Sequence, residues 1–97
     1  MTADSAGVTA PLPVVRPQGI VQRYRSWLPL PPDAAPVTLG EGGTPLVRLR
    51  RIERLWELPV PLYAKVEGQN PTGSFKDRGM AVAVTLAARD GVRAVVC

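Results

Sequence analysis

Lys76 is the residue whose type and position most clearly suggest chemistry in this sequence. It lies in the segment QNPTGSFKDRGM, residues 69–80, and is one of only two lysines in a chain of 97 residues that otherwise takes its positive charge from arginine. The sequence that follows it, residues 79–88, is GMAVAVTLAA, in which only Thr85 is polar. A lysine placed at the start of an almost unbroken apolar helix requires an explanation.

Three features of this position favour the neutral amine of Lys76. The N-terminus of a helix carries partial positive charge, which disfavours a nearby ammonium. Burial in apolar surroundings disfavours the charged form further. The preceding turn, residues 70–73, is rich in residues that bring backbone close to a ligand. A neutral amine condenses with carbonyl compounds, so a Schiff base to an anionic carbonyl compound is one hypothesis, and pyridoxal phosphate is the commonest such cofactor.

Two other interpretations of the same residues remain open. In the first, Lys76 is a structural lysine whose stem packs against the protein while its ammonium reaches solvent. In the second, the turn before it binds phosphate. The second is less well supported, because NPTGSFK has neither the GxxxxGK[ST] nor the GxGxxG spacing.

The helix that carries Lys76 can be predicted from local signals. Ser74 and Asp77 form an S-x-x-D capping pattern, in which the acid reaches back to the serine amide. We therefore expect a helix from Phe75 to about Arg89, with Gly91 supplying a left-handed stop. Because its sequence is apolar on nearly every side, we expect this helix to be covered nearly all round.

Strands are predicted on both sides of this helix. Residues 60–66 alternate between apolar and other side chains, which is typical of a strand, and VRAVVC, residues 92–97, begins a run suited to a buried parallel strand. Together they predict a βαβ unit, preceded by a short amphipathic helix from Leu49. Because the chain stops at Cys97 inside a strand, we expect an N-terminal fragment of a larger α/β protein.

Composition narrows the class of protein. The chain is 45% hydrophobic and 21% charged with a net charge of +4, as in ordinary soluble domains. Four clustered arginines are interleaved with acids, which favours a solvated helix face over a nucleic-acid surface; they are Arg48, Arg50, Arg51 and Arg54. With one cysteine and no histidine, no metal site is predicted. Residues 1–19 resemble a flexible tail and not a secretory signal, and no membrane span is expected.

Two longer segments carry a family resemblance. GEGGTPLVRL, residues 40–49, and LYAKVEGQNPTGSFKDRGM, residues 62–80, resemble the threonine synthases. These are fold type II pyridoxal-phosphate enzymes of the tryptophan synthase β-subunit superfamily. The resemblance covers about residues 37–97 and implies an α/β fold with a parallel sheet flanked by helices. Residues 20–97 would then be the N-terminal part of the catalytic domain.

The resemblance also implies roles for individual residues. Lys76 would bond to pyridoxal 5'-phosphate and then act as acid and base, and Phe75 would lie against the cofactor ring. The alternative for Phe75 is a core residue of the first helical turn. We expect Asp77 to cap the helix, Arg78 to form a structural ion pair and Thr44 to shape a turn near the site.

The family converts O-phospho-L-homoserine and water into L-threonine and phosphate, the last step of threonine biosynthesis. The resemblance implies a homodimer as well, and the single cysteine is compatible with a reduced, cytoplasmic setting. Cysteine synthases tend to have valine where this chain has Phe75, and threonine dehydratases resemble GSFKIRGA, so Asp77 and Met80 favour threonine synthase. The alternatives are another reaction of this superfamily, such as dehydration of threonine or serine, or a non-catalytic binding module.

The resemblance places the remaining cofactor ligands beyond Cys97. The glycine-rich loop for the cofactor phosphate and the residue that faces the pyridine nitrogen would both lie there. We therefore expect the 97-residue chain alone to be inactive and poorly folded.

Overall fold

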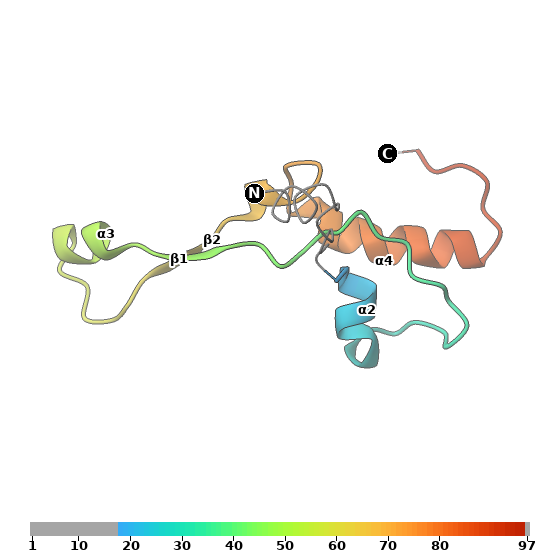
Figure 1. Cartoon of the computed structure of the whole chain (residues 1–97), viewed down its shortest axis with the longest axis horizontal. Helices are drawn as coiled ribbons and strands as arrows, with labels where there is room; N and C mark the ends of the chain where they lie inside the picture. The colour runs from blue at the N-terminus through green and yellow to red at the C-terminus, as the bar shows by residue number, and fades with distance from the viewer. Residues whose placement is uncertain (1–17, 97) are drawn as a thin grey trace, which may run out of the picture.

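The structure is a computed structural model in which residues 18–96 are described (Figure 1). The predicted tail, residues 1–19, and Cys97 therefore lie almost wholly outside the described part of the chain. The elements in chain order are α2 (Ile20–Tyr24), the 3₁₀ helix η1 (Arg25–Trp27), β1 (Leu46–Arg48), α3 (Arg50–Leu55), β2 (Tyr63–Lys65), the 3₁₀ helix η2 (Glu67–Gln69) and α4 (Lys76–Arg89).

A small core forms where α2 packs against α4 (Figure 1). Its buried apolar side chains are Ile20, Val21, Ala34 and Ala81. Thr85 is fully buried, and its Oγ1 accepts a hydrogen bond of 3.0 Å from the backbone N–H of Val37. The single polar residue in the middle of α4 therefore ties the segment that follows α2 to the helix.

β1, α3 and β2 form an arm that extends away from this core (Figure 1). β1 and β2 pair antiparallel, with Val47 opposite Ala64, and α3 lies at the tip between them. The helix predicted after Leu49 is thus confirmed. Ile52 is half-buried, but Leu55 at the end of α3 and Trp56 just after it are uncovered by the described residues, with exposed fractions of 73% and 65%.

The predicted βαβ unit is not present in the described structure. Residues 92–96 form no strand, and the sheet among the described residues is the antiparallel pair β1–β2. A strand exists only when a neighbour satisfies its backbone hydrogen bonds, and no strand of the described chain lies beside residues 92–96. The strand predicted over residues 60–66 is shorter, Tyr63–Lys65, because only these residues have partners in β1.

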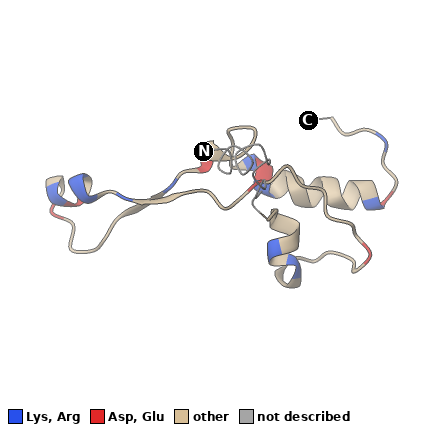
Figure 2. Cartoon of the chain, viewed as in Figure 1, with Lys and Arg blue, Asp and Glu red and all other residues tan. Residues whose placement is uncertain are grey.

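α4 begins and ends close to the predicted residues, but it is much less buried than predicted. It runs from Lys76 to Arg89, one residue inside the predicted start, and Gly91 adopts a φ of +77°. Only Asp77, Ala81 and Thr85 are buried, so the prediction of a helix covered nearly all round is wrong for the described chain. Figure 2 shows no charged residue along α4 between its two ends, so its uncovered faces are apolar.

The described helices are short. α4 has 14 residues, whereas a membrane-spanning helix needs about 20. No helix within residues 18–96 is long and apolar enough to cross a membrane.

Candidate functional site

The two lysines of the chain have different surroundings. The Nζ of Lys65 donates a hydrogen bond of 2.5 Å to the backbone carbonyl of Thr44. Lys76 is exposed, and within residues 18–96 no hydrogen bond or ion pair involves its Nζ. Its backbone N–H donates to Ser74 Oγ at 3.1 Å. Lys76 is therefore the lysine whose amine is available to a ligand in the described structure.

Lys76 is exposed, contrary to the burial expected from the sequence. Burial by the apolar helix was expected to disfavour its charge, but the described residues do not cover it. Phe75, beside it, is 64% exposed, so the alternative of a core residue does not hold within the described chain. The two side chains that the resemblance assigned to the cofactor are both accessible.

The turn before Lys76 is held by Asp77. This buried carboxylate accepts hydrogen bonds from the backbone N–H of Thr72, at 2.9 Å, and from the Thr72 hydroxyl. Asp77 was predicted to reach back to the Ser74 amide, and that prediction is wrong, since the carboxylate is engaged by Thr72. Gly73, with a φ of +78°, allows the turn in a conformation that residues with side chains rarely adopt.

Arg78 forms the structural ion pair that was predicted for it. Its Nε lies 2.5 Å from Glu67 Oε1 and its Nη2 lies 3.0 Å from Glu67 Oε2, a two-pronged contact. Thr44 Oγ1 donates to Glu67 Oε2 at 2.6 Å and accepts from Arg78 Nη2 at 3.1 Å. Asn70 Nδ2 also donates to Glu67 Oε1 at 3.1 Å.

These hydrogen bonds stabilise the ionised carboxylate of Glu67. Those from Arg78, followed by that from Thr44, lower the pKa of Glu67 from its ordinary value of 4.5 to about 2. Glu67 follows β2, Thr44 precedes β1 and Arg78 belongs to the first turn of α4. The carboxylate thus joins three segments beside the start of α4.

Glu41 provides another buried carboxylate, which fixes the glycine-rich loop of residues 40–43 that precedes β1. Glu41 is 2% exposed and accepts from the backbone N–H of Ile20 and Leu39 and from the Thr38 hydroxyl. Burial acts to raise the pKa of Glu41, but these hydrogen bonds outweigh it and lower the pKa. Gly42 N–H then donates to Asn70 Oδ1 at 2.9 Å, which connects the loop to the turn before Lys76.

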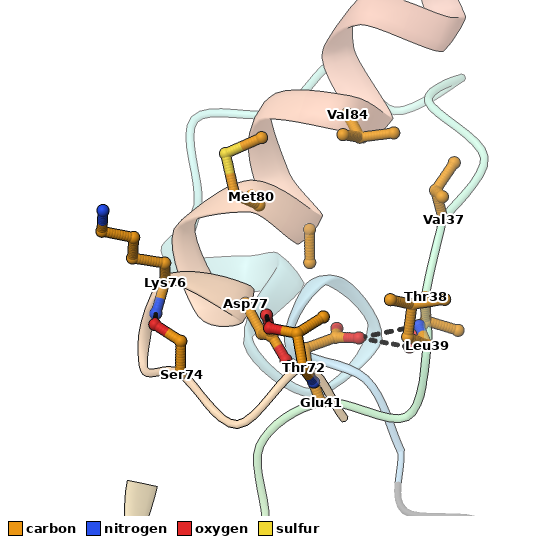
Figure 3. A pocket seen from close by; sticks show the side chains of 11 residues that line it. Val37, Thr38, Leu39, Glu41, Thr72, Ser74, Lys76, Asp77, Met80 and Val84 are labelled. Atoms are coloured by element: carbon orange, nitrogen blue, oxygen red, sulfur yellow. Dashed lines mark hydrogen bonds between the residues drawn. The ribbon is translucent and has the colours of Figure 1, made fainter. Parts of the chain in front are cut away.

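A cavity of about 690 Å³ lies between residues 37–41 and α4 (Figure 3). Met80, Ala81 and Val84 line it from the helix, and Thr38, Thr72 and Asp77 are also among its lining residues. Lys76 is at its edge, and Figure 3 shows its side chain extending away from Thr38 and Leu39. A smaller hollow of about 380 Å³ is lined by Phe75, Lys76, Arg78, Gly79 and Met80.

The sequence assigned no role to Glu67 or Glu41, and it placed Asn70 in the turn without indicating its side-chain partners. Glu67 and Asn70 lie inside the segment that carried the resemblance, and Glu41 lies inside GEGGTPLVRL. Acids and amides next to glycine-rich turns are often hydrogen-bonded within them. Several of their partners, however, lie 21 to 28 residues away in the sequence, and no local pattern identifies such pairs.

Residues 37–97 match the family of pyridoxal-phosphate dependent enzymes. The match covers more than half of the chain and includes the free lysine, the turn before it and the network around Glu67. The chain belongs to this family of pyridoxal-phosphate dependent enzymes.

Within this family the chain is similar to threonine synthases. The threonine synthase of Mycobacterium leprae is 52% identical over 79 residues, which are 81% of this chain and 21% of the relative. That of Methanocaldococcus jannaschii is 53% identical over 78 residues, 79% of this chain and 19% of the relative. That of Halalkalibacterium halodurans is 46% identical over 80 residues, which are 82% of this chain and 22% of the relative. The chain therefore spans about a fifth of the length of these relatives.

The described residues fit the cofactor that defines the family. A pyridoxal phosphate needs a reachable lysine amine and space beside it, and Lys76 lies at the edge of one hollow and within a second. Their volumes are in the range of small-molecule sites, roughly 300–1,000 Å³. The exposed ring of Phe75 lines the same hollow as Lys76.

Proposed function

We propose that this chain is the part of a threonine synthase that carries its cofactor lysine, Lys76. The observation that carries the proposal is the free amine of Lys76 at the start of α4, inside the segment that matches the family. The similarity to threonine synthases from three distant organisms supports the choice of reaction. The substrate would be O-phospho-L-homoserine, and the products would be L-threonine and phosphate.

Lys76 Nζ would hold the cofactor, and the Phe75 ring would lie against it. Bound pyridoxal phosphate supplies an electron sink for charge that develops on the substrate carbons. Once the substrate amine has replaced it, the Nζ of Lys76 would carry protons to and from those carbons. In the balanced reaction Cβ loses a proton, the bond between Cγ and the phosphate oxygen breaks, and Cγ gains a proton. Water supplies the hydroxyl that adds at Cβ and a proton to the released phosphate.

The chain would act as part of a longer protein. Its relatives are about five times as long as the matched segment, and apolar residues of the arm and α4 are uncovered in the described chain. We propose that residues 20–97 belong to the N-terminal part of the catalytic domain. Residues 92–97 would join a parallel sheet there, as the family resemblance implies. A cytoplasmic homodimer is part of the same proposal.

The reaction is tested by a substrate panel on the intact protein, with phosphate release and amino-acid products both measured. We expect stoichiometric phosphate and L-threonine from O-phospho-L-homoserine. Conversion of threonine or serine to an oxo acid and ammonia, without phosphate release from O-phospho-L-homoserine, would assign the protein to a dehydratase reaction. Absence of any cofactor absorption band in the purified protein would instead support a binding module.

A further inference from the structure

We propose that Glu67 is a positioning residue that aims Lys76 by fixing the rotation of the first turn of α4 through Arg78. The proposal rests on the proposed role of Lys76 as the cofactor lysine. Within residues 18–96, the carboxylate of Glu67 is bonded to Thr44, Asn70 and Arg78 and not to the amine of Lys76.

The contacts of Glu67 are those of a rigid support. Both of its oxygens are engaged by Arg78, and each also accepts a hydrogen bond from a second side chain, Thr44 or Asn70. Asn70 Nδ2 donates to the Glu67 backbone carbonyl as well, at 2.9 Å. A guanidinium held at two points by a carboxylate with four donors cannot turn without breaking several hydrogen bonds together.

The position of Arg78 along the helix makes this support relevant to Lys76. Successive residues of an α-helix are about 100° apart, so Lys76 and Arg78, two residues apart, project on nearly opposite sides of α4. A contact that fixes the side of the first turn that carries Arg78 therefore also fixes the direction in which the Lys76 side chain projects from α4. Asp77, held by Thr72, fixes a third direction of the same turn.

Small rotations of this turn would matter for catalysis. Side chains lie about 5–6 Å from a helix axis, so a rotation of about 10° moves a side-chain tip by about 1 Å. Misplacement by about 1 Å can lower a rate by about 10²-fold. The ion pair therefore has a role beyond the small stability of an ordinary surface pair.

The test uses the Glu67→Gln variant of the intact protein, which keeps the size of the side chain and removes its charge. We expect kcat to fall about 10- to 100-fold with KM and bound cofactor content unchanged. We also expect a changed circular dichroism band of the bound cofactor, which reports its orientation without turnover. Glu53→Gln is the matched control, because Glu53 binds Arg48 through two similar contacts of 2.9 and 3.2 Å in the arm. It should leave both readouts unchanged.

Arg78→Ala provides the second arm of the test. Added guanidinium ion should restore part of the kcat of this variant, because the ion can occupy the space beside Glu67. The kcat of Lys76→Ala should not change when guanidinium is added. Wild-type kcat and dichroism in Glu67→Gln would overturn the proposal. The proposal would also be overturned if the loss of kcat were fully explained by a smaller amount of folded or cofactor-loaded protein. If the wild type releases no phosphate from O-phospho-L-homoserine, the proposed reaction fails, while the dichroism band still decides whether Glu67 positions Lys76.

Discussion

Lys65 and Lys76 show how the same residue type acquires different roles from its surroundings. The amine of Lys65 is bound to a backbone carbonyl at the base of the arm, and Lys76 is exposed at the start of α4. The type, position and turn context of Lys76 were evident in the sequence. Its exposure was not, because burial depends on which distant segments cover a helix, and the pattern of α4 alone does not contain that information.

Replacement of Lys76 tests its role as the cofactor lysine. In the intact protein, Lys76→Ala should abolish the absorption band of the lysine-bound cofactor and lower kcat by at least about 10²–10⁴-fold, the usual contribution of a general acid or base. Absorption spectra and phosphate-release rates measure the two effects. Lys65→Ala is the matched control and should keep the band. A Lys76→Ala protein with an unchanged band would exclude this lysine as the anchor.

The network around Glu67 predicts a pH dependence. The pKa of Glu67 is lowered from 4.5 to about 2, first by Arg78 and then by Thr44. A carboxylate with a depressed pKa contributes stability that is fully present above its unfolded pKa and is lost as pH falls through its folded pKa. The contribution should therefore be complete above about pH 4.5 and disappear between about pH 4.5 and 2.

A carboxyl-carbon NMR titration of the intact protein measures this pKa directly. Glu67 should remain ionised down to the acidic end of that window. In the Arg78→Ala variant its pKa should rise toward the ordinary value, because the largest cause of the shift has been removed. If Glu67 of the unmodified protein titrated near 4.5, the network would not form as described.

At the scale of elements, local signals predicted helices better than strands. The ends of α4 follow from Ser74 and Gly91, which act on the residues next to them, and α3 follows from apolar periodicity. β1 was missed, and residues 92–96 were predicted as a strand that the described structure lacks, because a strand depends on a partner elsewhere in the chain. Asp77 does not reach the Ser74 amide as predicted, because its carboxylate accepts a hydrogen bond from Thr72 in the preceding turn instead.

The loop before β1 gives a test at this scale. Gly42 has a φ of +82°, and a Cβ there would lie 2.8 Å from Ile20 Cδ1. Gly42→Ala should therefore cost about 1–3 kcal/mol of unfolding free energy, through backbone strain and crowding of α2. Chemical denaturation of the intact protein measures the loss.

Gly68→Ala is the control for that substitution. A Cβ at Gly68 meets nothing within 4 Å and its φ lies outside the left-handed region. Its effect should stay within about 0.5 kcal/mol. Equal stabilities of the two variants would show that the described loop conformation is not the one adopted by the intact protein.

The described part of the chain is extended for its length. Its radius of gyration is 19.6 Å, whereas a compact domain of about 100 residues has about 13 Å. Between residues 18 and 96, four apolar residues are buried, while the exposed apolar side chains include Trp27, Trp56, Leu55 and Val96, each at least 65% exposed. The apolar sequence of α4 and the buried strand expected after it predicted this need for further partners, and the short length of the chain relative to the threonine synthases agrees with it.

The 97-residue chain expressed alone should therefore unfold without a sharp transition. Its few buried apolar side chains cannot offset the conformational entropy of ordering the chain. We expect broad loss of circular dichroism on heating, binding of a hydrophobic dye under native conditions and no phosphate release from O-phospho-L-homoserine. A cooperative unfolding transition together with cofactor-dependent phosphate release would contradict this expectation.

Reductive trapping tests the central claim most directly. Borohydride treatment of the intact protein fixes pyridoxal phosphate to the lysine that holds it, and peptide mass spectrometry then locates the added mass. We predict that it lies on Lys76, in the peptide that contains GSFKDRG, and not on Lys65. Added mass on another lysine, or none in a folded and cofactor-supplied protein, would contradict the assignment of Lys76.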